Sequence, residues 1–285
     1  MGRDAKVISI LISIFFFFSG FFSVAISEEP DQTIAGFHLS GFGREGNMTW
    51  EISSVSADVF SEQIQLNDFV GTLYGDEKII VSAKKGDFNK NQNRVHLEDD
   101  VVISTESGAE LTTEYLDWNR ETAEISNSVP VDIKKDNMFI TGVGLSGDTN
   151  LSKIGLERDV EVKIHDKKKK IIITCSGPLS INYVDNIAVF NREVVVDDGQ
   201  SQMYSDLMQV FFRASSSNTK TSSFAGRMGE VERIIARGNV KIVREDNVSY
   251  SNEAIYNTND NTLSLTGRPK LIIYSMESQD AFIGN

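Results

Sequence analysis

The chain has 285 residues and a formal net charge of -13, which comes from 41 acidic and 28 basic residues. Sequence-independent binding to nucleic acid relies on lysine and arginine side chains that neutralise phosphates, so this charge argues against a nucleic-acid partner. The one cysteine, Cys175, cannot form an internal disulfide or a zinc cage, and the three histidines lie far apart. We therefore expect no metal and no cofactor in a chain that is long enough for a sizeable core.

The N-terminal segment indicates the compartment. Residues 7–26 are almost entirely apolar, and Arg3 and Lys6 precede them, whereas acidic residues follow. As a helix this stretch would reach about 30 Å, enough to cross a bilayer. The basic flank predicts a cytoplasmic N-terminus and an exported remainder. Residues 1–27 are therefore predicted to be a transmembrane helix that anchors the chain, although residues 25–27 also fit the cleavage site of a signal peptide.

From residue 37 onward, apolar and polar residues alternate in short runs, of which Ile79, Val81 and Ala83 form one. Period two, bounded by Gly, Asn, Asp and Ser, is typical of half-buried strands. No segment after residue 27 has the spacing of an amphipathic helix. The sequence therefore predicts an all-β fold of many short antiparallel strands.

Two short elements recur along this part of the chain. One is a proline at the start of a strand, at Pro130, Pro178 and Pro269, where its missing N–H does least harm to the sheet. Units of this size cannot bury an apolar face alone, so they must stack on one another. The other element is a turn residue followed by a strand, and its copies are residues 100–103, 159–162, 193–196 and 239–242.

Several segments could be interpreted as functional sites, but a structural interpretation is preferred. Residues 213–229 are rich in Ser, Thr and Asn and predict a flexible loop, with a lid as the alternative. Residues 142–147 match GxGxxG, but no helix follows, which favours a turn over a nucleotide site. Residues 167–170 are four lysines, interpreted as a solvated hairpin tip or as a contact for lipid phosphates. The acidic pairs at 99–100 and 197–198 are interpreted as polar turn residues.

The order of these motifs resembles a known family, the periplasmic lipopolysaccharide-export proteins of the LptC type. The segments that carry this resemblance after the apolar N-terminus are residues 37–39, 50–52, 64–66, 95–101, 111–118, 129–131 and 140–145. The remaining repeats resemble the related LptA or OstA-like domain, at residues 173–179, 188–190 and 238–242. The resemblance thus implies an anchor at 1–27, an LptC-like unit at 28–150 and a fused LptA-like unit at 151–285.

The resemblance implies an elongated, open, twisted β-jellyroll in which lipopolysaccharide acyl chains lie in a continuous apolar groove, without enzymatic activity. Alternation assigns apolar side chains to the inward face and polar ones to the outward face. The inward positions expected to line the groove are Trp50, Ile52, Ile79, Val81, Val95, Leu97, Val101, Ile103, Leu111, Trp118, Ile125, Val131, Ile133, Ile140, Val160, Val162, Val240 and Ile242.

The resemblance also implies partners and a location. The chain has no GxxxxGK[ST] loop, so the driving energy would come from an ABC transporter complex in the inner membrane. Further jellyroll bridge proteins would pair with its edge strands by β-augmentation. The protein would be a single-pass inner-membrane protein with its bulk in the periplasm, or a cleaved periplasmic form.

Two other classes of function remain open at this point. The repeats alone would also fit a membrane-anchored structural or adhesive β-solenoid, which would have a closed and filled interior and transport no lipid. A glycan-processing enzyme would commonly need two inward carboxylates about 5–10 Å apart. No such pair stands out in the sequence, so the transport hypothesis is preferred.

Overall fold

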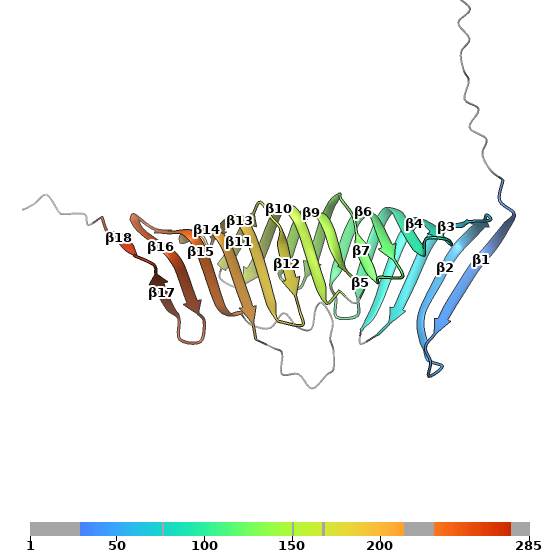
Figure 1. Ribbon diagram of the computed structural model, residues 1–285, viewed down its shortest axis with the longest axis horizontal. Coiled ribbons are helices and arrows are strands. Elements are labelled where there is room, and N and C mark those ends of the chain that lie inside the picture. The colour runs from blue at the N-terminus through green and yellow to red at the C-terminus, as the bar shows by residue number, and fades with distance from the viewer. Residues whose placement is uncertain (1–28, 76, 150, 167–168, 214–230, 275–285) are drawn as a thin grey trace, which may run out of the picture.

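The computed structural model describes residues 29–75, 77–149, 151–166, 169–213 and 231–274. These residues form one elongated antiparallel sheet of 18 strands, with β1 and β18 at opposite ends of the long axis (Figure 1). The prediction of an all-β fold is confirmed for the described residues. The strands are β1 (Gln32–Phe42), β2 (Met48–Val59), β3 (Gln63–Tyr74), β4 (Lys78–Asn89), β5 (Arg94–Thr105), β6 (Glu110–Asn119), β7 (Glu124–Ser126), β8 (Pro130–Lys135), β9 (Met138–Asp148), β10 (Lys153–Asp166), β11 (Lys169–Cys175), β12 (Leu179–Asn182), β13 (Ile187–Asp197), β14 (Ser201–Phe212), β15 (Val231–Arg244), β16 (Asn247–Asn257), β17 (Thr262–Thr266) and β18 (Lys270–Ile272).

In three places two short strands together take the position of one long strand. For example, β6 pairs with β7 near Trp118 and with β8 near Leu111. The same arrangement joins β11 and β12 to β10, and β17 and β18 to β16. Pro130 begins β8, and Pro178 and Pro269 directly precede β12 and β18. The predicted position of the prolines at strand starts is therefore confirmed.

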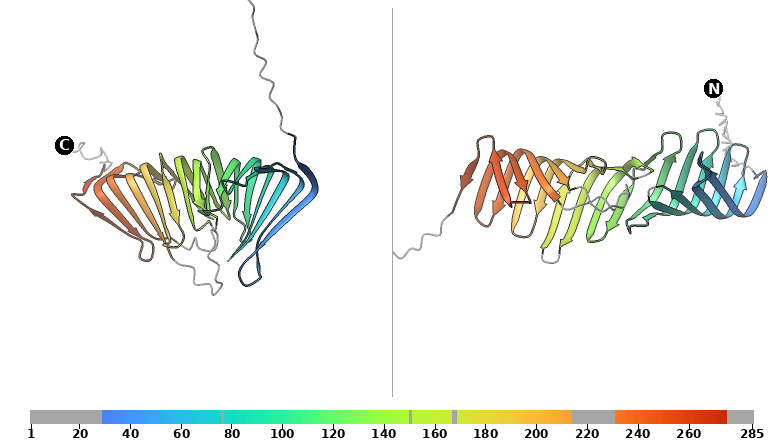
Figure 2. Two further views of the ribbon diagram at one scale, coloured as in Figure 1. Left: turned by 45° about the vertical axis from the view of Figure 1, so that its right-hand side comes forward. Right: turned by 90° about the horizontal axis from the view of Figure 1, so that it is seen from below.

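The long strands bend near their centres at residues with positive φ. In β5, Asp99 and Asp100 have φ of 64° and 53°, and the register with β6 shifts between Glu98 and Val101. Such bulges kink a strand and increase its twist. The sheet is thereby folded into two layers (Figure 2). We call the layer that contains residues 101–105 of β5 half-sheet 1, and the layer that contains residues 94–98 half-sheet 2.

These bends correct the interpretation of the repeated element as a turn that precedes a strand. Its first residues, Asp100, Asp159, Glu193 and Asn239, all have positive φ, but they lie inside β5, β10, β13 and β15. Each is followed by a valine that is buried between the layers: Val101, Val160, Val194 and Val240. A single residue near the left-handed region bends a strand without ending it, which a sequence pattern cannot distinguish from a turn.

The prediction of a turn at residues 142–147 is wrong. They lie within β9, where Gly144 has a φ of 79° and occupies the bend. Space explains the glycine, because a Cβ there would lie 2.8 Å from the Glu157 side chain. Asp197 and Asp198, by contrast, accept hydrogen bonds from the backbone of the turn after β13, as predicted.

Two further predictions fall on residues outside the described ranges: the transmembrane helix at 1–27 and all but the first residue of the loop at 213–229. In the part of the chain that the structure describes, no helix is long and apolar enough to cross a membrane. The first two of the four lysines at 167–170 also lie outside the described residues. Asp166 and Lys169, which flank these two lysines, pair with each other as strand neighbours.

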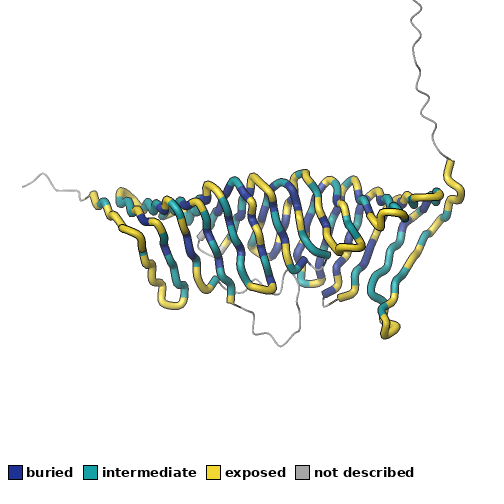
Figure 3. Tube along the Cα trace, in the orientation of Figure 1, coloured by how far each residue is buried: buried dark blue, intermediate teal, exposed yellow. Residues whose placement is uncertain are grey.

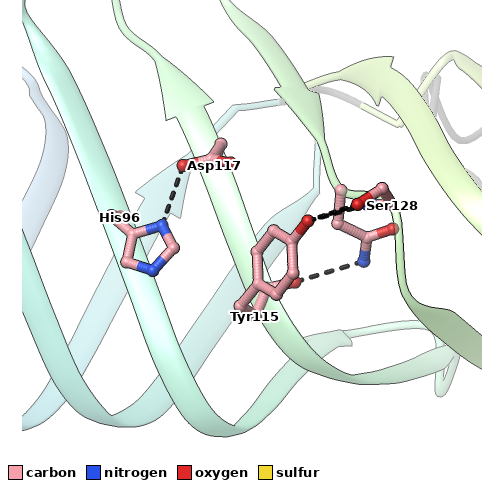
Figure 4. A network of polar contacts seen from close by, with 5 residues as sticks. His96, Tyr115, Asp117 and Ser128 are labelled. Atoms are coloured by element: carbon pink, nitrogen blue, oxygen red, sulfur yellow. Dashed lines mark hydrogen bonds and ion pairs between the residues drawn. The ribbon is translucent and has the colours of Figure 1, made fainter.

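The core lies between the half-sheets, and buried positions alternate with exposed ones along the strands (Figure 3). Outward side chains connect neighbouring strands by polar contacts (Figure 4). His96 Nδ1 lies 2.8 Å from Asp117 Oδ1, and the Tyr115 hydroxyl lies 2.6 Å from that of Ser128. At the break between β7 and β8, Asn127 donates to the carbonyl of Tyr115 and accepts from the Leu145 N–H.

Candidate functional site

An apolar cleft opens between the half-sheets near the β1 end of the molecule. Half-sheet 1 supplies residues from β2 to β5, and half-sheet 2 supplies residues from β5 to β7 and from the turn after β9. The lining residues are Trp50, Glu51, Ile52, Phe69, Gly71, Thr72, Leu73, Ile79, Val81, Leu97, Ile103, Leu116, Trp118, Ile125, Thr149 and Leu151.

Strand register places the apolar side chains of this cleft next to one another. Leu97 of β5 stands opposite Leu116 of β6, and Trp118 stands opposite Ile125 of β7. Leu116 and Trp118 are two positions apart in β6, and directly paired residues share a face, so all four side chains face the same side of the sheet. That side faces the interior between the half-sheets, so the wall of the cleft is mostly apolar.

Glycines make room for the aromatic rings of the cleft. A Cβ at Gly41 of β1 would collide with the Trp50 indole, and one at Gly71 would lie 2.9 Å from the Phe69 ring. Gly41 stands directly opposite Trp50 in the β1–β2 register. Any larger residue at Gly41 would therefore move the Trp50 ring, so this glycine sets the position of an aromatic wall.

The cleft is suited to alkyl groups and has little polar chemistry to offer. The Trp118 Nε1 atom is buried and has no hydrogen-bond partner among the described residues. Glu51 is the one ionisable residue in the lining, and its carboxylate accepts a hydrogen bond from the exposed Tyr74 hydroxyl. Each CH₂ that leaves water for such a surface contributes about 0.8 kcal/mol. Within the described residues, no group of three His, Cys, Asp or Glu side chains could hold a metal ion.

Arg120 lies at the mouth of the cleft, where the two half-sheets end. It follows β6 in the turn before β7, and its guanidinium carbon lies 5.3 Å from the ring centres of Trp50 and Phe88. Trp50 belongs to half-sheet 1, whereas Arg120 and Phe88 belong to half-sheet 2. The guanidinium therefore lies beside one aromatic ring from each half-sheet.

The cleft ends near the middle of the molecule. Leu151, in the turn between β9 and β10, is buried and closes the cleft together with Ile125. Beyond it, fully buried Leu156, Leu179 and Tyr183 fill the space between the half-sheets. Burial raises the pKa of Tyr183 far above its ordinary value, so the phenol is neutral. The described interior is thus open at one end and packed in the middle, which differs from the continuous groove that the sequence resemblance implies.

All the residues expected to line a groove point into the interior, but fewer than half border the cleft. Those that border it are Trp50, Ile52, Ile79, Val81, Leu97, Ile103, Trp118 and Ile125. Those that pack in or against the hydrophobic core elsewhere are Val95, Val101, Leu111, Val131, Ile133, Ile140, Val160, Val162, Val240 and Ile242.

Sequence reasoning missed Phe69, Leu73, Leu116 and Leu151. Leu116 could have been predicted from the sequence, because it lies two positions before Trp118 in the same strand. Phe69 directly follows the bend at Asp68, whose φ is 54°, so the period of two is interrupted there. Leu151 lies in a turn and belongs to no periodic run.

Two family models match the chain. The family model described as "Lipopolysaccharide-assembly, LptC-related" matches residues 7–166, and the model "LptA/(LptD N-terminal domain) LPS transport protein" matches residues 176–285. No curated protein matches the chain. Among solved structures, the chain is similar to LptH from Pseudomonas aeruginosa, described as the LptA homologous periplasmic component of the conserved lipopolysaccharide transport device. The identity is 12%, the match covers 69% of this chain and 95% of LptH, and the TM-score is 0.19.

Proposed function

Because this chain belongs to the LptC-related family of lipopolysaccharide-assembly proteins and continues into an LptA-like segment, we propose that it is a bridge component of lipopolysaccharide export. In this proposal the cleft shields lipid acyl chains from water after an inner-membrane ABC transporter complex releases them. Residues 1–27 anchor the chain, residues 28–150 form the LptC-like unit, and residues 151–285 extend the path toward the outer membrane. Both matched models describe assembly or transport proteins rather than enzymes.

The observation that carries this proposal is the apolar cleft with two tryptophans in its wall. A multi-chain lipid exposes many CH₂ groups, each unfavourable in water by about 0.8 kcal/mol. A cleft lined by Trp50, Leu73, Leu97 and Trp118 removes such groups from water without a chemical reaction.

The ends of the sheet support pairing with other jellyroll proteins. β1 contains no Asp, Glu, Lys or Arg, and among the described residues it has one strand neighbour, β2. Edge strands in proteins that stay apart are commonly protected by charges or prolines. At the two ends Phe42 and Leu271 are exposed. The neutral β1 edge suits strand addition by a partner jellyroll.

One observation favours the second candidate, a structural or adhesive β-solenoid. The interior around Leu156, Leu179 and Tyr183 is filled by side chains, as such a protein requires. The open cleft at the β1 end has no role in that alternative. Lipid binding therefore distinguishes the two functions.

The test is photo-crosslinking of the purified full chain to lipopolysaccharide. A benzoylphenylalanine in place of Trp118 faces the cleft, and the same group in place of the neighbouring Asp117 faces the outer surface. We expect a lipid adduct at position 118 and little at position 117. Equal labelling at both positions, or none at position 118, would contradict the proposal and favour the solenoid.

A further inference from the structure

Within the described residues, the Arg120 guanidinium lacks the ion pair that several other basic side chains of the sheet make. Lys84 and Lys85 form ion pairs with Asp100 and Asp99, and Arg237 pairs with Glu253. Within the described residues, no carboxylate makes an ion pair or hydrogen bond with the Arg120 guanidinium. Its contacts there are the faces of two aromatic rings.

The turns around Arg120 hold it at the rim. Its backbone N–H donates to the Asn93 carbonyl at 3.0 Å, and Thr149 of the next turn donates to the Ala123 carbonyl at 3.0 Å. The rim of half-sheet 2 is thus tied together on both sides of the arginine. The exposed guanidinium extends from this fixed backbone toward Trp50 on the opposite half-sheet.

Resting on the proposed function, we propose that Arg120 binds a phosphate group of the lipid whose acyl chains enter the cleft. An arginine guanidinium offers a planar fork of N–H donors that matches phosphate oxygens, and such charge-assisted hydrogen bonds are stronger than neutral ones. The rings of Trp50 and Phe88 keep the cation near the mouth when no anion is present. An amphiphile with an apolar tail and an anionic head fits this juxtaposition of an apolar wall and a cationic rim.

The chemistry also explains how a chain with a net charge of -13 can receive an anionic lipid. Glu51 is the one acidic residue in the lining of the cleft, and the Tyr74 hydroxyl donates a hydrogen bond to its carboxylate. An anionic head at the mouth of the cleft therefore lies next to the Arg120 cation. Screening at physiological salt limits the repulsion from more distant charges, because the Debye length is about 8 Å.

The experiment measures binding of two amphiphiles with the same tail, dodecyl phosphate and dodecyl glucoside, below their micelle concentrations. The full chain is kept soluble by an amphipathic polymer, because detergent would itself enter the cleft. Tryptophan fluorescence reports on the site directly, since both tryptophans of the chain line the cleft. The variants are Arg120→Gln, Arg120→Lys and the control Arg94→Gln, which changes an exposed arginine that begins β5 on the same rim.

We expect Arg120→Gln to weaken dodecyl phosphate binding about tenfold, equivalent to about 1.4 kcal/mol, and to leave dodecyl glucoside binding within about twofold. Arg120→Lys should recover part of the loss, and Arg94→Gln should have no effect. Equal weakening for both amphiphiles would overturn the proposal and leave Arg120 as a structural part of the mouth.

Two other outcomes separate the alternatives. If inorganic phosphate alone binds as tightly as dodecyl phosphate and with the same dependence on Arg120, the ligand is a free anion and the proposal fails. If neither amphiphile changes the fluorescence of the unaltered chain, the proposed function fails, and the inference that rests on it fails as well.

Discussion

The buried valine after each bend is the residue on which the two layers depend most directly. Val194 of β13 is buried between the half-sheets, whereas Val195 next to it faces outward and is only partly buried. Removing two methyl groups from a packed interior loses their transfer free energy and leaves a cavity. Val194→Ala should therefore lower the free energy of unfolding by about 2 kcal/mol. Val195→Ala, measured in the same urea titration, should lower it by less than half as much; equal losses would contradict this assignment of faces.

Asp87 of β4 is a carboxylate in an unfavourable place. Its Oδ1 atom is buried without a hydrogen-bond partner among the described residues, and burial raises its pKa, although His96 opposes the shift. A raised folded-state pKa means that this site contributes stability below the unfolded pKa of about 3.9 and loses it as pH rises through the folded value. Asp87→Asn removes the titration. We expect the variant to gain stability over the parent between pH 4 and pH 7 in urea unfolding, and a constant difference across that range would refute the explanation.

At the scale of elements, the breaks between paired short strands depend on close backbone approach. Gly177, between β11 and β12, has a φ of 93°, and a Cβ there would collide with the backbone of Glu157 and Arg158 on β10. Gly199, in the turn after β13, also has a positive φ of 79°, but a Cβ there would meet open space. Gly199→Ala should cost about 1 kcal/mol for its conformation alone. Gly177→Ala should cost about 3 kcal/mol or more because overpacking adds to the same conformational term; calorimetric unfolding of both variants measures the difference.

Strand alternation made most of the elements predictable, and the bends set the limit. Val101 and Val240 could be assigned to the interior because each begins a run of period two. The continuity of β5 through Asp99 and Asp100 could not be predicted, because residues near the left-handed region are far commoner in turns than inside strands. The cleft itself depends on which interior spaces stay unfilled. That property arises from packing between strands distant in sequence, such as β2 and β7, and has no local signature.

At the scale of the whole molecule, the interior divides into an open end and a packed middle. Acyl chains in the cleft would meet Leu151, and behind it the filled space around Leu179 and Tyr183. Lipid can advance along the sheet only if the half-sheets separate there. Packed interiors lose favourable contacts when they open, so the separation requires lipid to replace the contacts that are lost. The proposed bridge thus predicts an interior that opens with its cargo.

Cys175 of β11 can report this opening because it is the one cysteine in the chain and is buried in the packed region. Burial raises the pKa of its thiol, which reduces the thiolate that reacts with maleimides. At pH 7 we expect alkylation to be much slower than in the urea-unfolded chain, because the buried thiol is shielded from the reagent and its raised pKa lowers the thiolate fraction. Lipopolysaccharide should accelerate it. An exposed cysteine in the β4–β5 turn, Asn91→Cys in a Cys175→Ala background, should react at the same rate with and without lipid. A Cys175 rate that lipid leaves unchanged, while crosslinks form at position 118, would mean that acyl chains stop at Leu151 and that the half-sheets stay together beyond it.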